Sequence, residues 1–221
     1  MRPTRRNRNG NPNAANGKLL DIWTWDPDRL EAWLIEEYQR STSLICCEHG
    51  FSHTILGIKR PLVLKLATIR HPKSRLISNF MYDVQRGFSA ERDILSYVSE
   101  GGKNRRPDYY TNLITGRTGT QARADAEAAI KAFDYVHILD APESWNYLAA
   151  NLTIAEDGRL KNFHSNSTNY EEEKLEKPRQ SVLDADAALD ALCAEESKLF
   201  EAVSAHFQPA GSGVADRHGR G

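Results

Sequence analysis

Arg70 and Ser78 stand eight residues apart, directly behind an apolar run that ends at Ile69. The two side chains could bind an anion together, because a guanidinium is a forked, permanently charged donor and a hydroxyl donates one more hydrogen bond. A helix that begins near Pro72 would add unpaired N–H groups and the positive end of its dipole, both of which favour phosphate. The spacing therefore indicates a phosphate-binding turn. The competing interpretation is a solvated turn in which Arg70 makes a surface ion pair.

Two histidines are candidates for a general base. His49 lies just beyond the apolar run 43–47 and directly before Gly50, and His53 follows four residues later. Histidine titrates near neutral pH, so it can remove the proton of an attacking hydroxyl. His49 is the first candidate and His53 is the alternate. The competing interpretation is that each is an ordinary surface residue.

Apolar periodicity predicts the elements that would position these side chains. Strands are expected over 43–47, 62–69 and 134–139. Because 62–69 is nearly continuous in apolar residues, it is typical of a strand that is buried on both faces. The expected helices begin at Pro27, near Pro72, at a Ser89 cap and at Pro142, and two more cover 121–133 and 183–207. Strands that alternate with helices predict an α/β fold with a parallel sheet covered by helices.

The remaining segments mark the limits of one domain. Residues 1–20 are basic and rich in Asn, which predicts a disordered start, and 208–221 are expected to form a flexible tail. A single α/β domain is therefore expected over 21–207. Within it, 104–119 is interrupted by Pro and Gly and is predicted to be a loop with one turn of helix at most. The polar stretch 155–180 is predicted to be a surface excursion.

The composition limits the functional classes. The chain has 29 Lys and Arg against 30 Asp and Glu, whereas a broad nucleic-acid interface needs a marked basic excess. No segment approaches the ~20 apolar residues that span a bilayer, and no signal peptide is evident, so a cytoplasmic protein without a nucleic-acid partner is expected. Cys46, Cys47 and Cys193 do not suggest a disulfide framework, and no Cys/His spacing indicates a metal site.

The segment TIRHPKSRLISNFMY, residues 68–82, resembles the 3′-phosphate-binding segment of the sulfotransferases. That segment consists of a strand, Arg, any residue, Pro, two residues, Arg, two residues, Ser and an aromatic-rich helix. Four residues of this chain match it: Arg70, Pro72, Arg75 and Ser78. The resemblance implies that Arg70 and Ser78 bind the 3′-phosphate of 3′-phosphoadenosine 5′-phosphosulfate (PAPS), with Pro72 and Arg75 as structural support.

The resemblance extends in both directions and covers residues 43–207. Upstream, LICCEHGFSHTILGIKRPLVLKLATIRHP is similar to the carbohydrate-type branch of the family and puts His49 at the histidine position of that branch. Downstream, YYTNLITG and AAIKAFDYVHILDAPESWNYL resemble its Asn-Leu-rich loop, Ala-rich helix and next strand. The segment ALCAEESKLFEAVSAHF, residues 191–207, resembles its closing helix, in which Glu196 matches an acidic residue.

The resemblance implies a P-loop-like sulfotransferase fold and a PAPS-dependent enzyme that transfers a sulfuryl group to a hydroxyl, expected to belong to a carbohydrate. His49, or His53 as the alternate, would be the base, PAPS the donor co-substrate, and no metal is required. The family binds the 5′-phosphosulfate with a loop after its first strand. That loop is not found here, because no apolar strand precedes Gly17-Lys18. We therefore expect a fold that is incomplete at its amino terminus, either because the sequence starts after the loop or because the loop is lost.

Two other functional classes stay open at this point. One is a non-catalytic remnant of the same fold that binds a nucleotide or a glycan without transferring a group. The other is an α/β protein with a purely structural role in interactions. No feature of the sequence predicts an oligomeric state.

Glu196 is unusual on physical grounds, because it falls on the apolar stripe of the last predicted helix, between Leu192 and Leu199. A buried carboxylate without a partner costs several kcal/mol. We therefore expect Arg75 to pair with Glu196 and to hold the phosphate-binding turn against the last helix. The alternative is that Glu196 lies at the edge of the stripe with its carboxylate in water.

Overall fold

The computed structural model describes residues 12–14, 16–40, 45, 53–58, 63–139, 141 and 172–207. These residues form a mixed α/β structure that is mostly helical and contains a small parallel sheet of two strands, β1 (Leu66–Ile69) and β2 (Tyr135–Ile138). The helices are η1 (Ile22–Thr24), α1 (Pro27–Gln39), α2 (His53–Leu56), α3 (Pro72–Arg86), α4 (Ile94–Ser99), η2 (Lys103–Arg105), α5 (Tyr109–Thr115), α6 (Thr120–Lys131), α8 (Glu172–Asp184) and α9 (Asp186–Phe207). The predicted α/β class and the predicted parallel pairing are confirmed.

Both strands are shorter than the sequence predicts. Leu66 pairs with Tyr135 and Ile69 pairs with Ile138, so β1 begins at Leu66 and not at the start of the expected 62–69 strand. A strand extends only as far as its backbone groups find a partner, and in the described residues the register with β2 runs from Leu66 to Ile69.

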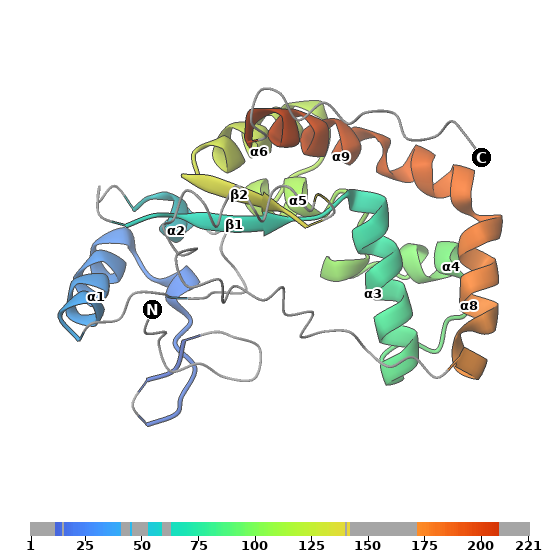
Figure 1. The fold of residues 1–221 in the computed structure, drawn as a ribbon, viewed down its shortest axis with the longest axis horizontal. Helices are drawn as coiled ribbons and strands as arrows, with labels where there is room; N and C mark the ends of the chain where they lie inside the picture. Colours follow the sequence, from blue (N-terminus) through green and yellow to red (C-terminus); the bar gives the residue numbers. More distant parts are fainter. Residues whose placement is uncertain are drawn as a thin grey trace, which may run out of the picture.

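One face of the sheet is covered by described helices, and on the other face Tyr135 is also buried while its partner Leu66 is exposed. Ile69, Val136 and Ile138 share a face and are buried, because paired residues of parallel strands point the same way. Helices α5, α6 and α9 pack on this face (Figure 1). Leu66 and Thr68 point to the other face and are exposed, Leu66 by 37%.

Two core clusters are joined by α9. The first lies on the covered face of the sheet and consists of Ile69, Tyr110, Ile114, Ala126, Ile130, Phe133, Val136, Ile138, Leu199 and Val203. The second packs α3 against α4, α8 and the start of α9, and consists of Leu76, Phe80, Val84, Ile94, Tyr97, Leu175, Ala185, Leu189 and Cys193. Figure 1 shows α3, α4 and α8 together beyond the carboxyl end of β1, with α9 running from this group back over the sheet.

The start of α3 follows from its local sequence. Pro72 occupies the first helical position, whose N–H would have no partner in any helix. Leu76, Phe80 and Val84 recur at a spacing of four residues and are buried. The helix ends at Gly87, which adopts a left-handed conformation with a φ of 72° that favours glycine.

The cap of α4 is Asp93 and not, as predicted, Ser89. The Asp93 carboxylate accepts the N–H of Ser96 at 2.8 Å, whereas the Ser89 hydroxyl accepts the N–H of Glu91 in the preceding turn. Asp and Ser are both common caps, so local sequence could not decide between them.

Two segments that the sequence indicates as loops are partly helical. Helix α5 lies inside 104–119, and α8 occupies the last part of 155–180 and continues to Asp184. The error at α8 comes from its charged residues and from Pro178, which interrupts backbone hydrogen bonding inside the helix. Leu175 of α8 is fully buried in the second core cluster. Tertiary packing of this kind outweighs a weak local preference.

Helix α1 begins at Pro27 as predicted, and the Asp26 carboxylate accepts the N–H of Arg29 at 2.9 Å. It belongs to a third, smaller cluster with η1 and α2, whose buried residues are Ile22, Leu30 and Ile58. Figure 1 places α1 and α2 near the amino end of β1, at the opposite side of the molecule from α3.

Some predicted elements fall on residues whose structure is not described. These are the 43–47 strand, apart from Ile45, and the helix expected from Pro142. Of the helices that are described, none is long and apolar enough to cross a membrane.

Candidate functional site

The turn between β1 and α3 carries Arg70, the first of the two predicted anion-binding residues. β1 ends at Ile69, Arg70 follows with a half-buried side chain, His71 is the N-cap residue, and α3 begins at Pro72. Arg70 therefore lies both at the carboxyl end of a parallel strand and beside a helix N-terminus. The predicted strand–turn–helix arrangement is therefore present. In open parallel sheets, ligands bind at this edge of the sheet.

Ser78 lies two turns into α3 and is half-buried. At about 100° per residue, position 78 is rotated by only ~20° from position 71, and it lies ~9 Å from Pro72 along the helix axis. Ser78 therefore stands on the helix face that continues the turn. No hydrogen bond joins Ser78 to Arg70, although both belong to the described part of the chain. An anion that contacts both side chains has to lie between them, along the first two turns of α3.

The peptide between Ile69 and Arg70 is held on both of its sides. The Ile69 carbonyl accepts the N–H of Leu139, which follows β2, at 2.9 Å. The Arg70 N–H donates to the hydroxyl of Tyr110, in α5, at 2.8 Å. Because the C=O and N–H of a trans peptide point in opposite directions, these hydrogen bonds fix the peptide plane between β2 and α5.

Arg75, in the second turn of α3, holds the segment that leads into α5. Its guanidinium donates to the carbonyl of Asn104 at 2.9 Å and to the carbonyl of Arg106 at 2.5 Å. It also lies over the ring of Tyr109, 4.2 Å from the centroid. Arg75 is 7% exposed, and burial lowers the pKa of its guanidinium.

Glu196 holds the first turn of α5 from α9. Its carboxylate accepts the backbone N–H groups of Tyr110 and Thr111 and, at 2.6 Å, the hydroxyl of Thr111. N–H groups at the start of a helix have no partner within the helix, so the carboxylate satisfies donors that would otherwise be buried alone. Glu196 is 2% exposed. Burial raises the pKa of its carboxyl, and the three hydrogen bonds act against that rise.

The predicted ion pair between Arg75 and Glu196 is not formed, although both residues are described. Each binds the 104–111 segment instead. The expectation that a buried Glu196 has a partner is confirmed, whereas the expected partner is wrong. Helices α3 and α9 are therefore connected through this segment.

The N-terminus of α3 also contacts α9 directly. The Lys73 ammonium lies 2.8 Å from the carboxylate of Asp186 and 2.6 Å from that of Asp190. The ring of His71 packs edge-on against Phe200, with 5.2 Å between ring centroids. Sequence reasoning missed these contacts and the Tyr110 hydroxyl, because the partners are far apart in the chain and their residue types are common.

Neither predicted base can be located relative to the turn. His49 lies outside the described residues, and of His53 only its place at the start of α2 is described. A catalytic role for either histidine therefore stays a prediction.

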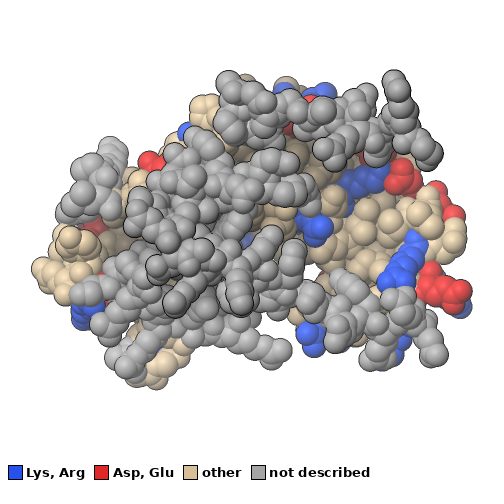
Figure 2. Space-filling model, in the orientation of Figure 1, with Lys and Arg blue, Asp and Glu red and all other residues tan. Residues whose placement is uncertain are grey.

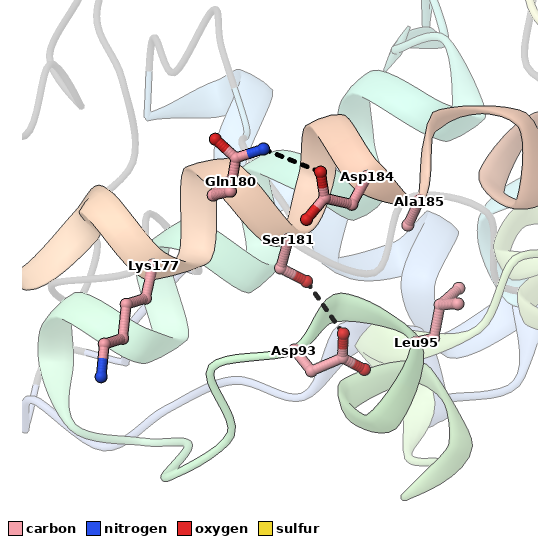
Figure 3. Close-up of a pocket in the computed structure, with 7 residues that line it drawn as sticks. All are labelled: Asp93, Leu95, Lys177, Gln180, Ser181, Asp184 and Ala185. Atoms are coloured by element: carbon pink, nitrogen blue, oxygen red, sulfur yellow. Dashed lines mark hydrogen bonds between the residues drawn. The ribbon is translucent and has the colours of Figure 1, made fainter.

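A cavity of about 340 Å³ lies between α4 and α8, and none of the predicted site residues lines it. Its lining residues are Asp93, Leu95, Lys177, Gln180, Ser181, Asp184 and Ala185. In Figure 3 the Ser181 hydroxyl points to the Asp93 carboxylate, to which it donates at 3.0 Å, and Gln180 donates to Asp184 at 2.7 Å. Because these groups already bind one another, the cavity is better described as the joint between two helices than as a ligand site.

On one face of the molecule (Figure 2), the described basic and acidic side chains are intermixed. On the face shown in Figure 2, the blue Lys and Arg side chains lie among red Asp and Glu side chains, and the described atoms of that face form no field of one sign. This matches the net charge of −1. A phosphate would therefore be attracted by local groups such as those of the β1–α3 turn, and not by a broad basic surface.

The titration of the Tyr110 hydroxyl makes the free energy of unfolding depend on pH in the alkaline range. Burial raises the pKa of its hydroxyl from the ordinary 10 to about 12. Because the folded state then keeps a proton that the unfolded chain loses, stability falls as the pH rises from 10 towards 12, by roughly 2 to 3 kcal/mol for this group. We expect urea unfolding to show that wild-type protein and Tyr110→Phe converge in stability over this range. A constant difference between pH 8 and pH 11.5 would contradict the assignment.

The chain matches no protein-family model, no curated protein and no solved structure.

Proposed function

We propose that this chain is a sulfotransferase-like protein whose β1–α3 turn binds the 3′-phosphate of PAPS, within a P-loop-like sulfotransferase fold. The observation that carries the proposal is the position of Arg70, between the carboxyl end of a parallel strand and the N-terminus of α3, a helix of 15 residues. The guanidinium, the first N–H groups of α3 and the Ser78 hydroxyl are the donors that a dianionic phosphate requires.

The proposed reaction is an in-line transfer. An acceptor hydroxyl, expected to belong to a carbohydrate, forms a bond to sulfur while the bond from sulfur to the bridging oxygen of the 5′-phosphate breaks. The hydroxyl proton passes to His49, with His53 as the alternate base, and adenosine 3′,5′-bisphosphate leaves with the bridging oxygen. The role of Arg70 and Ser78 is to hold the donor, so their effect is one of positioning and charge stabilisation. This chemistry requires no metal.

A second candidate function is nucleotide binding without transfer. It is favoured by the structure around Gly17-Lys18. Among the described residues ahead of β1, this is the one place whose sequence resembles the donor loop of the family. There the chain makes a tight turn in which Asn13 and Leu19 form an antiparallel bridge, and the Gly17 N–H donates to the carbonyl of Ala14 at 2.9 Å. A phosphate-binding loop would instead connect a strand to the N-terminus of a helix.

The proposal can be tested by calorimetric titration with adenosine 3′,5′-bisphosphate and with adenosine 5′-monophosphate. Because only the first ligand carries the 3′-phosphate, we expect it to bind at least ten-fold more tightly. Equal affinity for the two nucleotides would overturn the assignment of the β1–α3 turn to a 3′-phosphate. Binding of neither nucleotide would overturn both candidate functions and favour a purely structural role. Radiolabelled sulfuryl transfer from PAPS to a panel of glycan acceptors then separates an enzyme from a protein that only binds.

A further inference from the structure

We infer that Tyr110 is a positioning residue for the phosphate site, acting through the backbone of Arg70. The inference rests on the proposed function, because it concerns the affinity of the β1–α3 turn for a 3′-phosphate. Tyr110 belongs to α5 and is separated from Arg70 by 40 residues. It is 6% exposed, so its hydroxyl cannot exchange the Arg70 N–H for bulk water without local rearrangement.

The first step is the geometry of the peptide that precedes the Arg70 side chain. Among the described residues, β1 pairs with a strand on one edge, and the Leu139 N–H binds the Ile69 carbonyl on that edge at 2.9 Å. On the opposite edge the Tyr110 hydroxyl accepts the Arg70 N–H at 2.8 Å and takes the place of a backbone acceptor. With both sides bound, the plane of the peptide is fixed, and with it the position of the Arg70 Cα from which the side chain extends.

The second step is that Tyr110 is itself held at three places. Its backbone N–H donates to the buried carboxylate of Glu196. Its ring contacts that of Tyr109, with 5.2 Å between centroids, and the Tyr109 ring lies under the guanidinium of Arg75. Its side chain is also part of the core cluster that covers the sheet. The hydroxyl is therefore presented to Arg70 by a rigid support.

The consequence concerns the entropy of binding. An arginine whose backbone is already fixed loses less conformational entropy when its guanidinium binds a phosphate than an arginine in a mobile turn does. Removing the Tyr110 hydroxyl releases the Arg70 backbone without changing the Arg70 side chain or its charge. The change should therefore weaken recognition of the 3′-phosphate while leaving other contacts with the nucleotide unaltered.

The experiment compares Tyr110→Phe with wild-type protein in titrations with adenosine 3′,5′-bisphosphate and adenosine 5′-monophosphate. We expect the bisphosphate to bind about five- to ten-fold more weakly to the variant, the size of effect that one buried hydrogen bond produces, while the monophosphate affinity is unchanged. In the ligand-free protein, we expect the amide of Arg70 to exchange with solvent faster in the variant.

Tyr97→Phe is the matched control. Tyr97 is also buried, belongs to the second core cluster, and donates its hydroxyl proton to the carboxylate of Asp83 at 2.8 Å. The Tyr97→Phe variant should lose comparable stability without a change in either nucleotide affinity.

A bisphosphate affinity of Tyr110→Phe equal to that of wild type would overturn the inference and leave the proposed function intact. A wild-type protein without a preference for the 3′-phosphate would overturn both. If Tyr110→Phe does not fold, the same two titrations are made with Glu196→Gln, which weakens the support of α5 at similar side-chain volume. An unchanged bisphosphate affinity of that variant would overturn the inference in the same way.

Discussion

Replacing Arg70 with alanine should weaken the binding of adenosine 3′,5′-bisphosphate by about 10- to 100-fold. The range corresponds to the loss of charge-assisted hydrogen bonds worth ~1.5–3 kcal/mol. The fold should persist, because the backbone N–H of Arg70, which binds Tyr110, is retained in the variant. Isothermal titration measures the affinity, and the thermal shift caused by saturating ligand gives an independent estimate of the same loss.

Two variants sharpen this experiment. Arg70→Lys keeps the charge but loses the forked geometry, so its affinity should lie between those of wild type and Arg70→Ala. Arg86→Ala removes an exposed arginine at the other end of α3, and its affinity should equal that of wild type if the effect is local. An affinity of Arg70→Ala within two-fold of wild type would show that the β1–α3 turn does not bind the 3′-phosphate.

Replacing Glu196 with alanine should lower the free energy of unfolding by about 2 to 4 kcal/mol. The substitution leaves three buried donors of Tyr110 and Thr111 without an acceptor and removes volume from the interior. In a chain of 221 residues this corresponds to a melting temperature lower by roughly 5–15 °C. Urea unfolding followed by circular dichroism measures the change.

The adjacent Glu195 provides the control for this prediction. Its side chain is 56% exposed and pairs with Lys198 on the surface of α9, so Glu195→Ala should change stability by less than ~1 kcal/mol. Glu196→Gln should lie between the two, because an amide oxygen can still accept an N–H from the first turn of α5. If Glu196→Ala and Glu195→Ala unfold at the same urea concentration, then the carboxylate does not support α5 in the way the hydrogen bonds indicate.

The fold could be predicted from the sequence where the signal is local. Helix α3 is one example, since Pro72 suits the first position of a helix and the apolar residues behind it recur with helical period. The parallel pairing of β1 with β2 is another, since a strand, intervening helices and a second strand have few ways to pack. The extent of burial was not predictable in the same way. Leu66 looks like a core residue in an apolar run and is exposed, whereas Leu175 stands in a charged run and is buried.

By itself the sequence determined the strand, the turn and the helix around Arg70, together with the requirement that Glu196 have a partner if it is buried. Only the tertiary structure decided what Arg75, Glu196 and the Arg70 N–H bind. Their partners are backbone groups and two hydroxyls that come from 29 to 86 residues away. Every residue carries a carbonyl and nearly every residue an N–H, so such partners leave no mark in the sequence. They are selected by the way in which α5 packs between the sheet, α3 and α9.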